Sequence, residues 1–252
     1  MIFLFRMIVL GFLAVLWLIL GLIVCLARPK HRNNVHILTK MLGCAKWVLG
    51  VKVTFRPNPN VDLEKIMPAV FVGNHQTNWD IITMTEVIAP GVVCVGKKSL
   101  IWAPIFGILF WLSGNILIDR QNAKKVGGDF LAIVKNIKDK SLSIWMFPEG
   151  HRSKGNGLLP FKSGAVHTAM LAGVPIIPFV TSSYAKQIKL NRWNNGEIIV
   201  EMLDPIMMDK VERSDLKKIN QELRTKMLNR IKELDKEVKR PEGTPAPVYG
   251  DE

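Results

Sequence analysis

The stretch "NHQTNWD", residues 74–80, places an aspartate, Asp80, five positions after a histidine, His75. On a continuous helix five residues turn by about 140°, so the two side chains would not share a face. A turn between them would let them meet, and the intervening residues are turn formers. A carboxylate could then hold the imidazole tautomer so that the other ring nitrogen accepts a proton from a hydroxyl. A polar turn between two buried elements is the alternative interpretation.

If His75 is a base, the sequence offers it no nucleophile of its own. No GxSxG stretch occurs, and none of the three cysteines has neighbours typical of a reactive thiol. We therefore expect the attacking hydroxyl to belong to a substrate. The cysteines are also too few for a disulfide framework, and neither CxxC nor HExxH spacing occurs, so we predict no metal site.

Charged residues follow three further apolar runs. They are Lys97 in "GKKSL", Arg120 in "GNILIDR", and Glu149 and Arg152, with Gly150 between them, in "FPEGHRS". A guanidinium group binds phosphate through two parallel hydrogen bonds, and a glycine lets a ligand approach the backbone closely. A surface ion pair or a solvated loop charge is the alternative at any one of these positions. Because all of them fall at the ends of successive predicted strands, we interpret them together as an anion-binding site.

The elements that would position these residues alternate between strands and helices. Short β-branched apolar runs predict strands at 51–55, 69–73, 92–96, 115–118, 143–147 and 174–180. Helical patterns lie at 80–88, 104–113, 123–138, 163–172 and 215–239, and "NNG" at 194–196 predicts a hairpin turn into a further strand. This alternation predicts an α/β fold with a mostly parallel central sheet flanked by helices. Open sheets of this kind bind ligands beyond the carboxyl ends of their strands, which is where His75 falls.

The N-terminal segment predicts a hydrophobic helical membrane anchor. Residues 7–27 form an uncharged run of 21 residues, long enough to cross a hydrocarbon core of about 30 Å as a helix. A cleaved signal peptide is the alternative, but Arg28 and Pro29 follow the run where small residues would precede a cleavage site. The flank after the run is the more basic one, which predicts that the rest of the chain is cytoplasmic. A second apolar segment, 36–51, is interpreted as a helix at the membrane interface or as a core helix of the folded domain.

Charge and composition narrow the class of partner. The apolar and charged fractions are those of a folded protein, and the formal net charge is +13. Residues 1–50 carry six bases and no acid, and residues 51–208 carry 17 bases against 11 acids. Beside a membrane segment, this excess favours phospholipid headgroups and phosphorylated or acidic partners, and we expect no nucleic acid partner. We divide the chain into an anchoring segment at 1–50, an α/β domain at 51–240 and a disordered tail at 241–252.

Four sequence blocks resemble those of the glycerolipid acyltransferase family, in the order of that family. They are "NHQTNWD" for NHxxxxD, "GNILIDR" for GxxxxxR, "FPEGHRS" for FPEGxRS, and "VPIIPF" for VPxxP. The blocks run from residue 74 to 179, and the similarity extends from the N-terminus to about residue 238. His151 departs from the family pattern, in which threonine is commoner, but its flanking Glu149 and Arg152 are intact.

The resemblance implies acyl transfer from acyl-CoA or an acyl carrier protein to the sn-2 hydroxyl of 1-acylglycerol 3-phosphate (lysophosphatidate), which forms phosphatidate. His75 would deprotonate the hydroxyl, and Asp80 would orient His75. The remaining roles concern substrate binding: Arg120 and Arg152 would hold the phosphate with help from Lys97, while Glu149 and Gly150 would position the glycerol. No cofactor is implied beyond the thioester co-substrate. The expected location is a bacterial inner membrane, among lipid substrates, with the catalytic domain on the cytoplasmic face.

Three alternatives remain open from the sequence. The same chemistry could act on glycerol 3-phosphate or on another lysophospholipid. His75 could instead activate water in a membrane-bound thioesterase or lipase. The chain could also be a non-catalytic anion-binding protein of the membrane.

Overall fold

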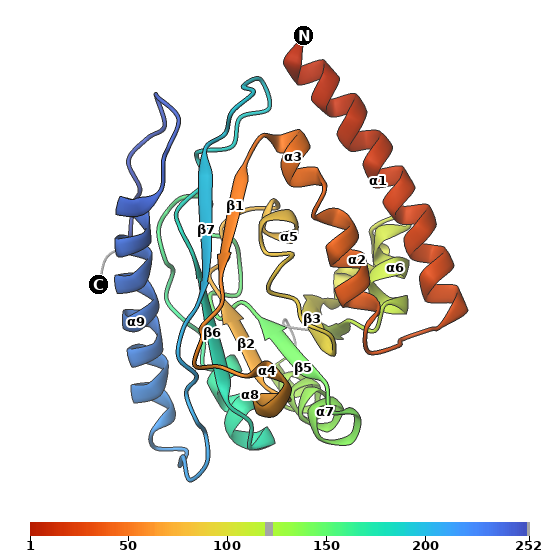
Figure 1. Ribbon diagram of the computed structural model, residues 1–252. Coiled ribbons are helices and arrows are strands. Elements are labelled where there is room, and N and C mark those ends of the chain that lie inside the picture. Colours follow the sequence, from red (N-terminus) through yellow and green to blue (C-terminus); the bar gives the residue numbers. More distant parts are fainter. Residues whose placement is uncertain (119–122, 251–252) are drawn as a thin grey trace.

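The computed structural model describes residues 1–118 and 123–250 of the chain and centres on a seven-stranded sheet (Figure 1). The strands are β1 (Lys52–Arg56), β2 (Val70–Gly73), β3 (Val92–Lys97), β4 (Ile116–Ile118), β5 (Ser143–Met146), β6 (Ile176–Thr181) and β7 (Glu197–Met202). Their order is β1-β7-β6-β2-β5-β3-β4, and every described pair is parallel except β6 with β7. The predicted α/β fold with a mostly parallel sheet is confirmed.

Helices cover both faces of this sheet. They are α1 (Ile2–Ala27), α2 (Asn34–Leu42), α3 (Ala45–Leu49), α4 (Leu63–Ile66), α5 (Asp80–Thr83), the 3-10 helix η1 (Lys98–Trp102), α6 (Phe106–Leu112), α7 (Ala123–Lys140), α8 (Gly164–Ala172) and α9 (Leu216–Glu237). Helices α7, α8 and α9 contact strands and one another on one face. On the other side α2 contacts β3 and α3 contacts β1, while α1 and α5 pack on these two helices and α6 packs on α1 (Figure 1). Burial between two helical layers explains why the central strands β2 and β6 are buried at every residue, whereas the edge strand β1 carries Lys52 and Arg56.

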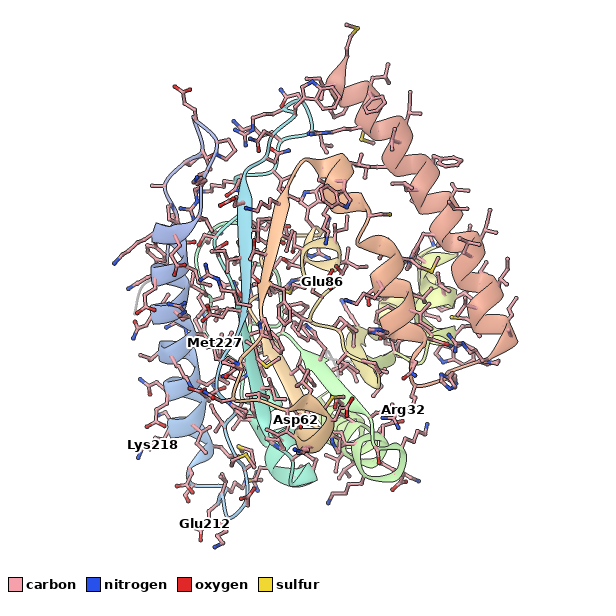
Figure 2. The ribbon with its side chains drawn as sticks, viewed as in Figure 1. Arg32, Asp62, Glu86, Glu212, Lys218 and Met227 are labelled. Atoms are coloured by element: carbon pink, nitrogen blue, oxygen red, sulfur yellow. The ribbon has the colours of Figure 1, made fainter. Side chains whose placement is uncertain are left out.

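Helix α9 shows how the amphipathic pattern orients an element. Met227 is fully buried and faces the sheet, whereas Lys218 is exposed and faces away (Figure 2). Leu223, Ile231 and Leu234 lie on the same buried stripe as Met227. The three- and four-residue spacing of these apolar side chains therefore fixes which side of the helix meets β6.

The predicted hairpin at 194–196 is wrong, because the antiparallel partner of β7 lies farther back along the chain. β6 ends at Thr181, and a long connection over 182–196 separates it from β7. Asn195, in the predicted turn, is fully buried, and its side-chain amide donates to the carbonyls of Leu49 at 2.7 Å and Lys189 at 3.0 Å. Turn residues here tie a long loop to α3 instead of closing a tight hairpin.

Two helical predictions are also corrected in extent. The predicted helix at 80–88 is only the single turn α5, followed by further turns, and it buries Ile82 and Thr83. The segment 36–51 forms two short helices, α2 and α3, that pack on β3, α5 and β1. Both segments therefore pack as part of the folded domain.

Helix α1 is the only described helix long and apolar enough to cross a membrane, judged by length and composition. Its 26 residues span about 39 Å. One side packs on α2, α3 and α6, where Gly21 approaches Leu38 and Leu109 closely. Most of its other large apolar side chains, such as Phe12 at 67% exposure, are uncovered. Helix α1 is therefore a candidate membrane anchor.

Arg6 is the exception within this apolar helix. Its side chain is 1% exposed, and its guanidinium donates to the carbonyls of Lys189 at 3.0 Å and Trp193 at 2.7 Å, and also to that of Arg192. The guanidinium also lies 5.6 Å from the centre of the Trp193 ring. Backbone oxygens of one loop thus partner the only charge in the helix.

The C-terminal segment differs from the predicted disorder over its described residues, 241–250. Tyr249 is partly buried against the core, and its carbonyl accepts a hydrogen bond from the backbone of Leu158 at 3.1 Å. Thr244 is held by a turn on Pro241. These contacts hold a Pro- and Gly-rich segment whose composition alone indicates flexibility.

Candidate active site

The carboxyl ends of neighbouring parallel strands bring the predicted site residues together. β6, β2, β5, β3 and β4 lie side by side and run in one direction. His75 follows β2, Lys97 ends β3, and Glu149 to Arg152 follow β5. Arg120, predicted to bind phosphate after β4, lies outside the described residues. The convergence depends on topology, since these residues are far apart in the sequence.

His75 and Asp80 meet across the turn that separates them. The Nδ1 atom of His75 lies 2.5 Å from Oδ2 of Asp80. The same oxygen accepts the backbone N–H groups of Gln76 at 2.8 Å and Thr77 at 3.2 Å. Because an ionised carboxylate can only accept, Nδ1 carries the hydrogen and Nε2 of the neutral ring has the free lone pair. Asp80 is 4% exposed, so these donors replace the water it has lost.

The imidazole ring is fixed by a second contact. It stacks on the ring of Phe147, with 4.0 Å between ring centres and an angle of 12° between planes. Over residues 1–118 and 123–250, no hydrogen bond joins Nε2 of His75 to a serine, threonine or cysteine. The ring is therefore held at one nitrogen and on one face, and its other nitrogen is free to meet a ligand.

His75, which carries this nitrogen, lines a cleft of about 990 Å³. Its lining includes three exposed cations, Lys97, Arg152 and Lys154, which we call its cationic wall. It also includes apolar side chains, which we call its apolar wall, among them Ile81, Met84, Ile88, Leu100, Phe106 and Phe110. The volume and the presence of both kinds of side chain suit a ligand with an anionic head and a long hydrocarbon portion.

Glu149 lies beneath this cleft instead of in its wall. It is 1% exposed, and its two carboxylate oxygens accept the backbone N–H groups of His75 at 2.6 Å and Leu159 at 2.9 Å. Burial, reinforced by the charge of Asp80 and opposed by the two N–H donors, raises the pKa of Glu149 to about 7. This placement differs from the prediction that Glu149 contacts the glycerol. A carboxylate buried this deeply is cut off from water, and the two backbone N–H groups supply hydrogen bonds that water would otherwise make.

Gly150 and Arg152 do line the cleft, as Lys97 does. The φ angle of Gly150 is 78°, a left-handed conformation that glycine adopts without steric cost. A Cβ there would meet Nζ of Lys162 at 2.9 Å. The glycine therefore allows the sharp turn that carries the chain from the buried Glu149 to the exposed Arg152, three positions later.

Three residues that sequence reasoning passed over hold the His75 loop to the end of β6. Asn74 exchanges two hydrogen bonds with Thr181, of 2.9 and 2.8 Å. Gln76 donates to the carbonyl of Ser182 at 2.8 Å and accepts the backbone N–H of Tyr184 at 2.8 Å. Asn74 and Gln76 stand beside His75 in one stretch, so their amide side chains were a visible signal. Tyr184 had no such signal, because its partners are more than 100 residues away.

Cys94 is the one cysteine in the described lining of the cleft. Burial raises its pKa to about 12, so the sulfur remains a protonated thiol, which is a poor nucleophile. Within the described part of the chain, no group of three or more His, Cys, Asp and Glu side chains could hold a metal ion. The described site thus consists of a base with its carboxylate, a cationic wall and an apolar wall.

A histidine base without a protein nucleophile, at the carboxyl edge of such a sheet, is suited to an enzyme that activates a hydroxyl of a substrate or a molecule of water. A family model described as "Acyltransferase" matches residues 57–182, which include His75, Asp80 and the strands that position them. The chain belongs to the acyltransferase family.

Individual relatives of this chain carry a more specific name than the family model does. The 1-acyl-sn-glycerol-3-phosphate acyltransferase of Salmonella typhimurium is 43% identical over 244 residues, covering 97% of this chain and 99% of that protein. The Escherichia coli enzyme of the same name is 43% identical over 238 residues, covering 94% and 96%. The human alpha form is 33% identical over 222 residues, covering 86% and 76%. The prediction of an acyltransferase is confirmed.

A solved structure shares the fold. The crystal structure of the 1-acyl-sn-glycerophosphate (LPA) acyltransferase of Thermotoga maritima matches with a TM-score of 0.71, covering 92% of this chain and 95% of that one. The two sequences are 17% identical over the match, so this likeness concerns the fold.

Proposed function

We propose that the chain transfers a fatty acyl group from a thioester to the sn-2 hydroxyl of 1-acyl-sn-glycerol 3-phosphate and so forms phosphatidate. The observation that carries this proposal is the His75–Asp80 pair in a cleft with a cationic wall and an apolar wall. The acceptor has the matching parts: a phosphate, a free hydroxyl and one acyl chain. The names of the curated relatives support the same acceptor.

The proposed mechanism has one base and a substrate nucleophile. Nε2 of His75 takes the proton of the acceptor hydroxyl as its oxygen attacks the thioester carbonyl. Asp80 keeps the hydrogen on Nδ1 and stabilises the imidazolium that forms. The imidazolium then returns the proton to the departing thiolate. The ester bond forms as the carbon–sulfur bond breaks, and the base is regenerated.

Cationic side chains would hold the phosphate away from the base. We assign this role to Arg152, with Lys97 as a second cation, and to Arg120, as expected from the sequence. Lys154 joins them, because it is exposed in the same cleft wall. A guanidinium can bind two phosphate oxygens at once, whereas an ammonium acts as a point charge. The phosphate would thereby fix the distance from the head of the acceptor to its hydroxyl.

The apolar wall would bind the hydrocarbon chains of the substrates. The cationic wall would also be available to the anionic groups of the acyl donor. Phe106 and Phe110 of α6 lie in the apolar wall. The donor is acyl-CoA or acyl carrier protein, both of which carry anionic groups at the far end of the pantetheine arm that bears the thioester. No cofactor beyond this co-substrate is proposed. We place α1 in a bacterial inner membrane, with the domain on the cytoplasmic face, from its basic flank.

An acceptor panel tests the proposal. Membranes containing the protein are incubated with labelled acyl-CoA and with lysophosphatidate, glycerol 3-phosphate or a lysophospholipid with a headgroup. We expect labelled phosphatidate from lysophosphatidate, and none from the His75→Ala variant, which should remain folded and membrane-bound. Labelled free fatty acid without phosphatidate would replace the transferase with a hydrolase. Labelled product from another acceptor alone would reassign the substrate.

A further inference from the structure

The two carboxylate oxygens of Asp80 have separate partners. Oδ2 binds His75 and two backbone N–H groups, as described above. Oδ1 accepts a hydrogen bond from the hydroxyl of Tyr184. Tyr184 is 1% exposed and Asp80 is 4% exposed, so water does not compete with this contact. Among the described side chains, Tyr184 is the sole recorded donor to Oδ1.

The direction of the Tyr184 hydroxyl is set by two threonines. Its oxygen accepts hydrogen bonds from Oγ1 of Thr83 at 3.2 Å and Oγ1 of Thr77 at 3.4 Å. A phenol oxygen has two acceptor positions and one hydrogen, so with both positions occupied its hydrogen points to Asp80. Burial and the adjacent Asp80 charge raise the pKa of Tyr184 well above its usual range. The hydroxyl therefore keeps its proton and remains a donor.

The backbone of Tyr184 is attached to the same loop as His75. Its N–H donates to the side-chain oxygen of Gln76 at 2.8 Å, and the amide nitrogen of Gln76 donates to the carbonyl of Ser182 at 2.8 Å. Gln76 directly follows His75. The tyrosine ring, the carboxylate and the imidazole are consequently held in one rigid unit that joins the ends of β2 and β6.

We propose that Tyr184 is a positioning residue, whose hydroxyl fixes the Asp80 carboxylate so that Oδ2 faces Nδ1 of His75. The torsion that orients an aspartate carboxylate is broad, so packing alone holds it poorly. A donor on Oδ1 removes this freedom and satisfies an oxygen that burial would otherwise leave unpaired. The inference rests on the proposed function, because it assigns Tyr184 to the alignment of the proposed base.

A purely structural role is the competing explanation, since Tyr184 also packs in the hydrophobic core. Tyr184→Phe separates the two, because it keeps the ring and removes one oxygen atom. We expect kcat to fall about tenfold, from the loss of a hydrogen bond to a charged group, with KM for lysophosphatidate within about twofold. Thr83→Val, which removes a supporting donor at similar volume, should lower kcat by a smaller factor.

The other tyrosine of the chain provides a matched control. Tyr249→Phe deletes the same atom from a partly buried ring near the C-terminus. It should keep wild-type kcat and KM. An unchanged kcat in Tyr184→Phe would overturn the proposal, as would an equal loss in both variants.

A double-mutant cycle with Asp80→Asn tests whether Tyr184 acts through Asp80. If it does, adding Tyr184→Phe to Asp80→Asn should lower the residual kcat by less than twofold. Multiplication of the two separate losses would contradict the proposal and indicate a general effect on the fold. Thermal unfolding of each variant shows whether the folded fraction differs at the assay temperature.

A measurement without substrate separates this inference from the proposed function. In ¹⁵N-histidine-labelled protein, the Nδ1–H resonance of His75 is assigned by its loss in His75→Ala. We expect Tyr184→Phe to shift and broaden this resonance, because its acceptor is no longer fixed, and Tyr249→Phe to leave it unchanged. An identical resonance in Tyr184→Phe would refute the positioning role. This readout does not depend on which acceptor the enzyme uses.

Discussion

Glu149 should make the stability of the folded chain depend on pH near neutrality. Its pKa rises from 4.5 to about 7 on folding, chiefly through burial. A carboxyl group with a raised pKa binds its proton more tightly in the folded state than in the unfolded state. Its stabilising contribution is therefore complete below pH 4.5 and is lost as the pH rises through 7. At about 1.4 kcal/mol per pKa unit, the shift corresponds to about 3 kcal/mol.

The perturbation is Glu149→Gln, which cannot ionise. It should destabilise the fold at acidic pH, because an amide has one oxygen to offer to the two N–H groups of His75 and Leu159. Between pH 5 and 8 the free energy of unfolding of the wild type should then fall toward that of the variant. The difference between the two curves should shrink by about 2.5 kcal/mol over this interval, because part of the effect is already lost at pH 5.

Urea unfolding followed by circular dichroism at a series of pH values measures these curves. Glu197→Gln is the matched control, because Glu197 is a surface carboxylate whose pKa is lowered, mainly by its hydrogen bond with Lys52. It is mostly ionised in both states across the interval, so its curve should run nearly parallel to the wild type. Parallel curves for Glu149→Gln and wild type would refute the reasoning, since they would show that Glu149 keeps one protonation state from pH 5 to 8.

Three further changes address the cleft and the anchor. Arg152→Ala should raise KM for lysophosphatidate about tenfold with kcat little changed, whereas the exposed Lys218→Ala on α9 should change neither; a fall in kcat alone would place Arg152 at the reacting centre. Gly96→Val should shift donor preference in an acyl-CoA length series toward shorter chains, because a Cβ there would lie 2.8 Å from the Phe110 ring; an unchanged preference would mean that the acyl chain lies elsewhere. Deletion of residues 1–27 should move protein from the membrane to the soluble fraction on centrifugation, and full retention would show that other surfaces suffice.

The sheet could be predicted because its strands are short, apolar and β-branched, and because parallel strands buried on both faces leave that pattern in the sequence. The gathering of His75, Lys97 and Arg152 followed from one rule, that the carboxyl ends of parallel strands share an edge. These inferences used local composition and a general topology. They needed no knowledge of which strands are neighbours.

The rest depended on contacts between distant segments. Nothing near Tyr184 in the sequence indicates that its hydroxyl meets Asp80, because β6 must first be placed beside β2. Glu149 was assigned to the substrate because the sequence shows that a residue is charged but not how deeply it is buried. Its burial beneath His75 depends on how the loops that carry the two residues pack. The hairpin predicted at 194–196 was wrong for the same reason, since Asn195 is hydrogen-bonded to α3 and to its own loop.

The buried Arg6 has a consequence for how the chain is made. Its carbonyl partners lie within residues 189–193 and are synthesised more than 180 residues after it, so the helix is made long before the loop that accepts its hydrogen bonds. A charged side chain in hydrocarbon is costly, and near a helix end it reaches for the interface until a partner is available. The hydrogen bonds of Arg6 can therefore form only after the 182–196 loop has been synthesised, so α1 acquires these contacts late in the formation of the native structure.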